Sequence, residues 1–266
     1  MKKYTDIVPW EIAPDVYCLG PQGRTQTNVY LVRGGSSWML IDTGWAEDGS
    51  RIKKAAESLF GADTRPAAIM LTHGHPDHGG SAPQLARTWE CPVYVHPAEL
   101  PLVAGDFSAI TKYAGPLDIW FILPLMRLMG RRRREAMLLR SSLKDVVRAL
   151  GPNPEIPGLP GWTWIPTPGH TPGHVAFFRT SDRTLITGDA VVTVKLNSVS
   201  GLLLQRQGLS GPPWYTSWSW PGVKESVATL ARLEPNVLAP GHGAPMTGAG
   251  TARALRAFAN HFSEAG

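Results

Sequence analysis

Residues 72–80 read Thr72-His73-Gly74-His75-Pro76-Asp77-His78-Gly79-Gly80 and directly follow the apolar run of residues 67–71. An apolar run of this length predicts a short buried strand, so the polar side chains are expected on the turn at its C-terminal end. Neutral imidazole and carboxylate are ligands that suit zinc, iron, manganese and cobalt. The turn therefore predicts a metal site, and its candidate ligands are His73, His75, Asp77 and His78.

Metal binding competes here with a simpler interpretation, a polar loop whose histidines hydrogen-bond locally. Four of the eight histidines of the chain belong to this turn or to its echo at His170, which favours metal binding. Alternate residues on a turn face opposite ways. The first two histidines of the turn can then serve one ion, and Asp77 with His78 a second.

Further ligands are expected outside the turn, because four groups cannot hold two ions without help. The loop from Thr167 to His174, punctuated by Gly and Pro, offers one ligand or two, His170 and His174. An apolar β-branched strand ends at Asp189, whose carboxylate can bridge two ions. A later strand ends at the Gly-flanked His242. Each candidate thus follows a predicted strand or joins two of them.

In combination these motifs resemble those of metallo-β-lactamase-fold hydrolases, the superfamily of glyoxalase II and the lactonases. The resemblance spans about residues 15–245. The matching motifs, in the order of the family, are Leu40-Ile41-Asp42-Thr43-Gly44, the turn of His73 to His78, Pro168-Gly169-His170, Gly188-Asp189 and Pro240-Gly241-His242-Gly243.

The resemblance implies seven metal ligands in two groups that share one bridging residue. The first metal would be held by His73, His75 and His170, the second by Asp77, His78 and His242, and Asp189 would bridge them. Two divalent ions are therefore expected as the cofactor, zinc first, with iron, manganese or cobalt as alternatives.

Two divalent cations that share an aspartate lower the pKa of a bridging water, so that hydroxide exists near neutral pH. One ion can also polarise a scissile carbonyl. By analogy with the family, Asp77 is the catalytic residue that orients the hydroxide and accepts its proton. The expected mechanism is hydroxide attack, a metal-stabilised tetrahedral oxyanion and departure of the leaving group.

Asp42 and His174 are expected beside the metals but not on them. In the family, Asp42 is buried and braces the His-rich turn; a helix or turn cap is the alternative for this residue type. His174 matches a histidine that is not a ligand, and we expect a structural hydrogen-bonding role. Cys18 and Cys91 have no adjacent histidine, so we expect buried thiols and no cysteine nucleophile.

A single domain over residues 1–266 is expected from the length and the 43% hydrophobic content. The resemblance implies an α/β (α+β) fold, a four-layer αβ/βα sandwich with the metals at one edge. Periodicity predicts strands near residues 15–20, 28–33, 36–41, 67–71, 93–96, 162–166, 174–179, 184–187 and 236–240, and helices near 49–60, 80–89, 223–233 and 249–263.

A helical, cap-like insertion is predicted between the first and second metal motifs, over about residues 97–160. Its apolar stretch, residues 116–129, is too short and too interrupted to span a membrane, which takes about 20 apolar residues. We favour a cap over the metal cleft, with a homodimer contact as a variant. Peripheral contact of residues 116–134, which include four consecutive arginines, with an anionic membrane surface is the alternative. Residues 136–150 are predicted to form an amphipathic helix.

An aromatic segment follows Asp189 and includes Trp214, Tyr215 and Trp218. It is predicted to line the mouth of a substrate pocket, with packing in the core or at an interface as the alternative. Apolar walls around a few polar anchors suit an acyl chain, an aromatic ring or a lactone.

Hydrolysis of an ester or lactone-like carbonyl is the predicted reaction. Glyoxalase II thioesterases usually carry a helical C-terminal domain, whereas only 24 residues follow His242. True β-lactamases of this fold lack the bridging aspartate, so Asp189 makes β-lactam hydrolysis at most a promiscuous activity. Homoserine-lactone hydrolases commonly have a tyrosine three positions after this aspartate, where this chain has Val192. Tyr215 is the candidate to replace it in space.

Three rival functions come from other classes. The excess of Lys and Arg over Asp and Glu, 26 against 21, invites a nuclease or phosphodiesterase. Much of the excess lies in one insertion and no RNA-binding module is recognisable, so a small molecule is the expected partner rather than nucleic acid. An iron-dependent persulfide dioxygenase of the same fold and a non-catalytic binding module are the others. The N-terminus resembles no signal peptide, which makes the cytoplasm the expected location.

Overall fold

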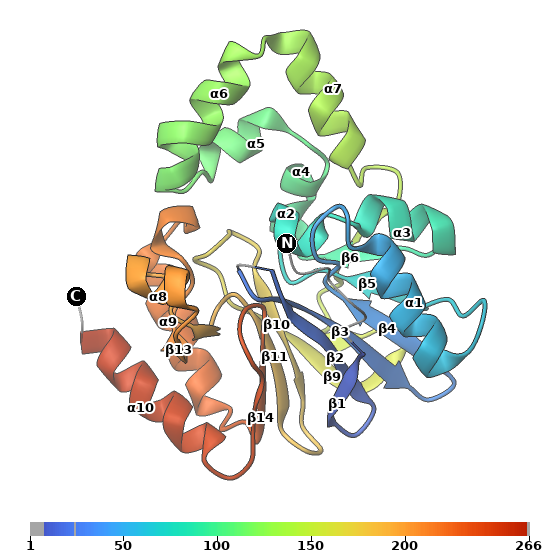
Figure 1. Cartoon of the computed structure of the whole chain (residues 1–266), viewed down its shortest axis with the longest axis vertical. Coiled ribbons are helices and arrows are strands. Elements are labelled where there is room, and N and C mark those ends of the chain that lie inside the picture. Colours follow the sequence, from blue (N-terminus) through green and yellow to red (C-terminus); the bar gives the residue numbers. More distant parts are fainter. Residues whose placement is uncertain (1–7, 24, 265–266) are drawn as a thin grey trace.

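The computed structural model describes residues 8–23 and 25–264. Two β-sheets pack face to face and helices cover the outer side of each, which gives the layer order αβ/βα (Figure 1). The predicted α/β sandwich is thereby confirmed, and a helical insertion separates the first metal motif from the second. The single domain expected over residues 1–266 stays a prediction. None of the described helices is both long and apolar enough to cross a membrane.

The first sheet follows chain order. Its strands are β1 (Trp10–Ala13), β2 (Val16–Gln22), β3 (Thr27–Gly34), β4 (Ser37–Ile41), β5 (Ala68–Met70), β6 (Val93–Val95) and β7 (Val147–Ala149). The strands β4 to β7 run parallel. Parallel strands end at the same edge of a sheet, so the residues after β4 and β5 become neighbours. Helices α1 (Gly49–Phe60) and α3 (Ala82–Trp89) cover the outer face.

The second sheet has the order β15-β14-β11-β10-β9-β8. Its strands are β8 (Glu155–Ile156), β9 (Leu159–Pro166), β10 (Val175–Arg179), β11 (Thr184–Gly188), β14 (Val237–Pro240) and β15 (Met246–Thr247). The pairing of β11 with β14 is parallel, which brings the residues that follow them, Asp189 and the loop of His242, to one edge. Helices α9 (Trp220–Arg232) and α10 (Thr251–Glu264) cover this sheet.

Three buried apolar clusters hold the four layers together. One joins the first sheet to α1 and α3 through Ile52 and Leu85. The central cluster lies between the sheets and includes Tyr30 and Phe177. The third joins the second sheet to α9 and α10 and includes Leu255. Full burial of side chains of this size stabilises the fold by about 1.5–3 kcal/mol each.

The helical insertion rises from one end of the sandwich (Figure 1). Its elements are η1 (Pro97–Glu99), α4 (Leu100–Val103), α5 (Phe107–Lys112), the π-helical η2 (Asp118–Ile122), α6 (Leu123–Leu128) and α7 (Arg131–Ser141). Its two ends meet, since the Leu143 amide donates to the Val103 carbonyl at 2.9 Å and the Ser142 hydroxyl to the Ala104 carbonyl at 2.9 Å. The chain therefore leaves and re-enters the sandwich at one place, and the insertion makes a second contact where the rings of Tyr113 and Trp218 lie 5.2 Å apart.

The amphipathic helix predicted over residues 136–150 is wrong beyond Ser141, where α7 ends. Residues 147–149 form β7, which pairs parallel with β6, and β8 follows before residue 160. Leu143 packs in the cluster under α1 and Leu150 in the cluster between the sheets, so these two side chains do not share a helical face. Pairing with β6 outweighs the helical spacing of the apolar residues.

Several short elements carry no periodic signal and were not predicted. A two-stranded ribbon of β12 (Val192–Val194) and β13 (Gln207–Ser210) encloses α8 (Val199–Leu204). The one-turn helix α2 (Pro76–Gly79) lies within the His-rich turn, and the 3-10 helix η3 (Trp214–Thr216) lies in the aromatic segment. Both belong to the candidate site.

Candidate metal centre

The candidate ligands gather at the edge where β5, β11 and β14 end. His73 and His75 lie on the extended turn after β5, and Pro76 then begins α2, which carries Asp77 and His78. Proline suits the first turn of a helix because its fixed φ is already helical and its missing N–H costs no hydrogen bond there. The change from extended turn to helix turns the later pair of ligands away from the first pair.

Potential ligand atoms form three overlapping groups, and within each group one atom per residue lies within 4.8 Å of the others. The groups are His73, His75 and His170; His73, His78 and Asp189; and Asp77, His78 and His242. The first and third have the membership expected for two separate ions. The second connects them through Asp189.

Asp189 lies between the two outer groups. Its Oδ2 atom is 3.3 Å from His170 Nε2 and 3.2 Å from His242 Nε2. Its Oδ1 atom is 3.3 Å from His78 Nε2. The carboxylate is buried, and its contacts reach both groups, which is the position that a bridging ligand requires.

Three buried polar atoms in this cluster have no hydrogen-bond partner among the described residues: His73 Nε2, His170 Nε2 and Asp189 Oδ1. A buried polar atom without a partner costs about 1–3 kcal/mol. Three such atoms in one cluster, all lone-pair donors of the types that bind divalent cations, fit a metal pair. The residues present are therefore compatible with the expected cofactor.

Hydrogen bonds on the outer side fix the orientation of the histidines. His78 Nδ1 donates to the Asp42 carboxylate at 2.8 Å. His73 Nδ1 donates to Thr72 Oγ1 at 3.0 Å, because the hydroxyl hydrogen is given to Asp42 at 2.8 Å. Asp42, at the end of β4, also accepts the Thr72 amide at 2.8 Å. Its contacts are those of a group that braces the His-rich turn, and it caps no helix.

The two later histidines are held in the same way. His242 Nδ1 donates to the Thr25 carbonyl at 2.8 Å. His170 Nδ1 donates to Ser217 Oγ at 3.0 Å, since the serine hydrogen is given to the Pro213 carbonyl at 2.7 Å. Metal-binding histidines usually donate their second N–H in this manner. In all four rings the Nε2 atom is left to face the cluster.

His174 lies against the cluster with both nitrogens engaged. Its Nδ1 donates to Thr167 Oγ1 at 2.7 Å, and its Nε2 accepts the backbone amide of Asp189 at 3.0 Å. Burial, followed by the charge of His170, holds the pKa of His174 well below its usual range, so the ring stays neutral and can accept. It joins none of the ligand groups and instead positions the backbone of Asp189.

Glu99, which had no role in the sequence-based prediction, ties the two ligand loops together. Its Oε2 accepts the Gly74 amide and its Oε1 the Gly173 amide, both at 2.8 Å. The side chain is fully buried, which raises its pKa against these hydrogen bonds. An acidic residue shortly after the predicted strand of residues 93–96 is the one signal in the sequence that points to it.

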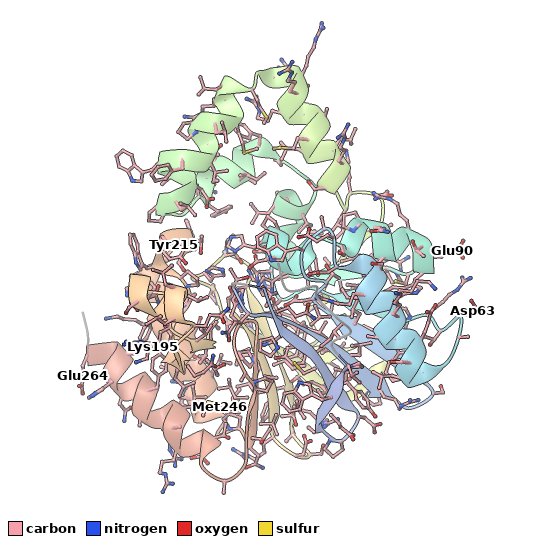
Figure 2. The ribbon with its side chains drawn as sticks, in the orientation of Figure 1. Asp63, Glu90, Lys195, Tyr215, Met246 and Glu264 are labelled. Atoms are coloured by element: carbon pink, nitrogen blue, oxygen red, sulfur yellow. The ribbon has the colours of Figure 1, made fainter. Side chains whose placement is uncertain are left out.

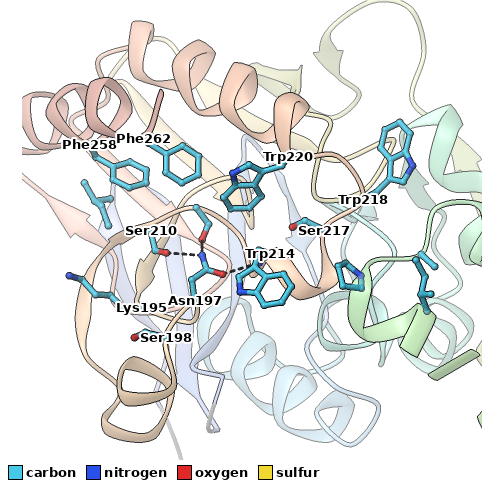
Figure 3. A pocket seen from close by; sticks show the side chains of 15 residues that line it. Lys195, Asn197, Ser198, Ser210, Trp214, Ser217, Trp218, Trp220, Phe258 and Phe262 are labelled. Carbon is cyan, nitrogen blue, oxygen red and sulfur yellow. Dashed lines mark hydrogen bonds between the residues drawn. The ribbon is translucent and has the colours of Figure 1, made fainter. Parts of the chain in front are cut away.

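The aromatic segment borders a cavity of about 850 Å³ (Figure 3). Trp214 and Trp218 line this cavity, as does Ser217, the partner of His170. The opposite wall includes Trp220 of α9, whose ring lies 5.4 Å from that of Phe262 of α10.

Tyr215 is not among the residues that line this cavity. It is half-buried on the side of the C-terminal half that faces the helical insertion (Figure 2). Burial, then the negative charges of Asp189 and Asp77, raise the pKa of Tyr215, so its phenol lies within reach of the field of the ligand cluster.

Metal binding is expected to release protons and to strengthen as the pH rises. Burial lowers the pKa of His78 and His242, but Asp189 and Asp77 outweigh it and hold both pKa values above the usual range in the metal-free protein. These rings therefore hold their second proton to a higher pH than an ordinary histidine does, and an entering ion must displace the proton on Nε2. Titration calorimetry with zinc in two buffers of different ionisation enthalpy measures the release. Proton uptake, or an affinity independent of pH, would contradict this reasoning.

Cys18 and Cys91 are buried, as expected from the sequence. Burial raises the pKa of Cys18 to about 12 and that of Cys91 to about 11, so neither is a thiolate near neutral pH. Both are free and buried, and neither belongs to a ligand group.

Comparison with known proteins gives concordant matches. The sequence model of the metallo-beta-lactamase superfamily matches residues 22–242. The "Probable metallo-hydrolase YflN" of Bacillus subtilis (strain 168) is 37% identical over 241 residues, 89% of this chain and 88% of that protein. The "Probable metallo-hydrolase YybB" of the same organism is 27% identical over 172 residues, 65% of each chain.

Solved structures of similar proteins agree with this family match. TTHA1623, solved in a di-iron-bound form, is 29% identical with a TM-score of 0.54, and the match covers 85% of this chain and 92% of that one. The metallo-beta-lactamase family protein TTHA1429 of Thermus thermophilus is 21% identical with a TM-score of 0.64, over 96% of this chain and 81% of that one. The second likeness concerns the fold alone.

Proposed function

The chain belongs to the metallo-beta-lactamase superfamily, and from that membership we propose that it is a dinuclear metal-dependent hydrolase of ester or lactone carbonyls. The observation that carries the proposal is the position of Asp189, between two ligand groups whose Nε2 atoms face inward. We assign the first ion to the group of His73 and the second to the group of His242.

Two divalent cations bound there would lower the pKa of the water between them and polarise a carbonyl oxygen. Asp77 is assigned to orient the attacking water and accept its proton. Its Oδ2 atom is 3.4 Å from His242 Nε2 and 3.9 Å from His78 Nε2, and its side chain keeps 17% of its surface exposed. A carboxylate that is both beside the ligands and open to solvent can receive a proton and pass it on.

Tyr215 is assigned a contact with the substrate carbonyl. Its raised pKa keeps the phenol protonated near neutral pH, so it can donate a hydrogen bond. Val192, three positions after Asp189, offers no donor, and Tyr215 would supply one from a different loop. A hydrogen-bond donor placed where negative charge develops on the carbonyl oxygen lowers the barrier for attack of water on the carbonyl carbon.

The cavity beside the aromatic segment supports a substrate with an apolar substituent. Its volume of about 850 Å³ lies within the range of about 300–1,000 Å³ that is usual for small-molecule sites. Tryptophan and phenylalanine rings form much of its wall, and Ser217 connects it to His170 at 3.0 Å. None of the candidate ligands lines this cavity, and Ser217 contacts His170 at Nδ1, on the side of the ring away from the cluster, so the cavity is proposed to hold only the apolar substituent of a substrate.

Zinc is the metal we propose, with iron as the alternative. The ligand set of imidazoles and carboxylates accepts both ions. The similar protein TTHA1623 has been solved in a di-iron-bound form, and this keeps iron in consideration for the present chain.

Metal analysis together with a hydrolysis panel tests the proposal. The panel contains p-nitrophenyl esters of increasing acyl length, lactones, a thioester, a cephalosporin and a phosphodiester. We expect two ions per chain, turnover of esters or lactones that rises with acyl length, and loss of turnover on chelation. A single iron with a silent panel would support the dioxygenase instead, and turnover of the phosphodiester alone would support the nuclease.

A further inference from the structure

The outer side of the helical insertion exposes large apolar side chains to solvent. On η2 and α6 the most exposed are Leu128 (84%), Trp120 (74%) and Phe121 (67%). We call the set the apolar outer face, and its members on η2 and α6 and at their start are Leu117, Ile119, Trp120, Phe121, Ile122, Leu125 and Leu128. Surface side chains of this size and number mark an interaction site.

Apart from Asp118 and Arg127, the side chains of η2 and α6 are apolar. Leu123 and Met126 are buried against the rest of the insertion, while Phe121, Leu125 and Leu128 recur at spacings of four and three on the exposed side. Large apolar side chains gathered on one exposed side of a helix normally pack against another surface. No other described part of this chain covers the outer side, whose side chains are exposed.

The charge beside the apolar outer face indicates which kind of surface it would bind. Residues 116–141 contain six arginines and two acidic residues, a net charge of +4 in a chain whose formal net charge is +5. Of the six, only Arg131 forms an ion pair within the described chain, with Glu135. Figure 1 shows α6 and α7 at the end of the molecule farthest from the sheets. The surface is therefore both apolar and strongly basic.

We propose that the helical insertion docks this protein on the surface of an anionic lipid bilayer. Tryptophan, phenylalanine and leucine side chains enter the boundary between head groups and acyl chains, and the neighbouring arginines bind the anionic head groups. A second copy of the chain fits less well. Two-fold pairing of the apolar outer faces would bring two segments of +4 charge together with no acidic surface between them.

The docking face adjoins the substrate cavity. Ile119 belongs to the apolar outer face and also lines the cavity, together with the exposed Trp214 and Trp218. An apolar substrate dissolved in the bilayer could pass from the docking surface to the cavity without crossing bulk water. This consequence rests on the proposed function, whereas the docking itself does not.

Vesicle sedimentation of the metal-loaded full chain tests the docking. One set of vesicles contains phosphatidylcholine alone and the other phosphatidylcholine with phosphatidylglycerol. We expect binding to the anionic vesicles and at least about tenfold weaker binding to the neutral ones, with the difference reduced by salt. Equal binding to both, or binding to neither, would overturn the proposal.

Two double variants separate the apolar and charged contributions. Trp120→Ser with Phe121→Ser, and Arg132→Glu with Arg133→Glu, change only exposed side chains, so the fold should persist. Each is expected to weaken binding to anionic vesicles by at least about tenfold. The matched controls Val8→Ser and Arg253→Glu, also exposed, should bind like the parent chain.

The readouts distinguish failure of docking from failure of the proposed function. All these variants should keep the parent turnover of a short soluble ester, because none of the changed residues belongs to the ligand groups or the cavity wall. Loss of vesicle binding with unchanged turnover supports docking. A dimer in the absence of vesicles that the Trp120→Ser, Phe121→Ser variant abolishes would assign the face to a second copy and overturn the membrane proposal.

Discussion

Replacement of Asp189 by alanine is expected to lower turnover by more than about 100-fold and to reduce the metal content of both groups. Loss of a residue that only orients a metal ligand costs about 10–100-fold, and Asp189 itself contacts histidines of both groups. The fold should persist, because the three buried apolar clusters are unchanged and the backbone amide of residue 189 still donates to His174. Elemental analysis and thermal unfolding followed by circular dichroism measure the two effects.

The Asp189→Asn variant is a more specific test, because asparagine keeps the shape of the side chain and removes its negative charge. A neutral amide cannot balance two divalent cations, so the asparagine variant should fail nearly as severely as the alanine variant. The matched control is Glu225→Ala, an exposed carboxylate on α9. Two ions per chain and parent turnover in Asp189→Ala would rule out a dinuclear site centred on this residue.

Replacement of His75 by alanine should remove one ion and leave the other. His75 belongs only to the group that also contains His73 and His170, whereas Asp77, His78 and His242 form their group without it. Burial, followed by the charge of His170, lowers the pKa of His75 to about 3, so the ring is neutral and ready to bind a cation. Turnover should again fall by more than about 100-fold, since the remaining ion lacks its neighbour.

One ion per chain by elemental analysis is therefore the expected result for His75→Ala, and none or a weakly held pair for Asp189→Ala. The control His261→Ala changes a histidine whose side chain is 93% exposed on α10 and should behave like the parent chain. Equal metal content in the His75 variant and the parent would show that His75 is not a ligand, even if turnover is lost.

The strands and long helices were predictable because their apolar residues recur with the period of the element. The helix predicted over residues 49–60 has these bounds in α1, where Ile52, Ala55 and Ala56 form the buried side. That the candidate ligands gather at one edge was predictable for a related reason. Each follows a short apolar strand, and the parallel pairing of β4 with β5 and of β11 with β14 brings strand ends to a common edge.

The hydrogen-bond partners of the candidate ligands could not be predicted from the periodicity of apolar residues. Ser217 and Thr25 lie in irregular segments, and their contacts with His170 and His242 join residues far apart in the chain. Glu99 reaches Gly173 across 74 positions, and no periodic pattern encodes a contact of that kind. The end of α7 was misjudged for another reason, since strand pairing with a distant β6 decided the structure of residues 147–149.

The two ends of the helical insertion lie side by side, so the segment between them can be replaced without a change to either sheet. Val103 and Leu143 are joined by a hydrogen bond of 2.9 Å, so a chain cut after Ala104 and before Ser142 presents two ends that a tight turn can connect. Glu99 lies on the sandwich side of the cut and would keep its hold on Gly74 and Gly173. Exchange of residues 105–141 would also remove Ala114, Pro116 and Ile119 from the cavity wall and Tyr113 from its contact with Trp218. It would therefore change both the outer surface and the cavity, while the hydrogen bonds of Glu99 to the ligand loops remain.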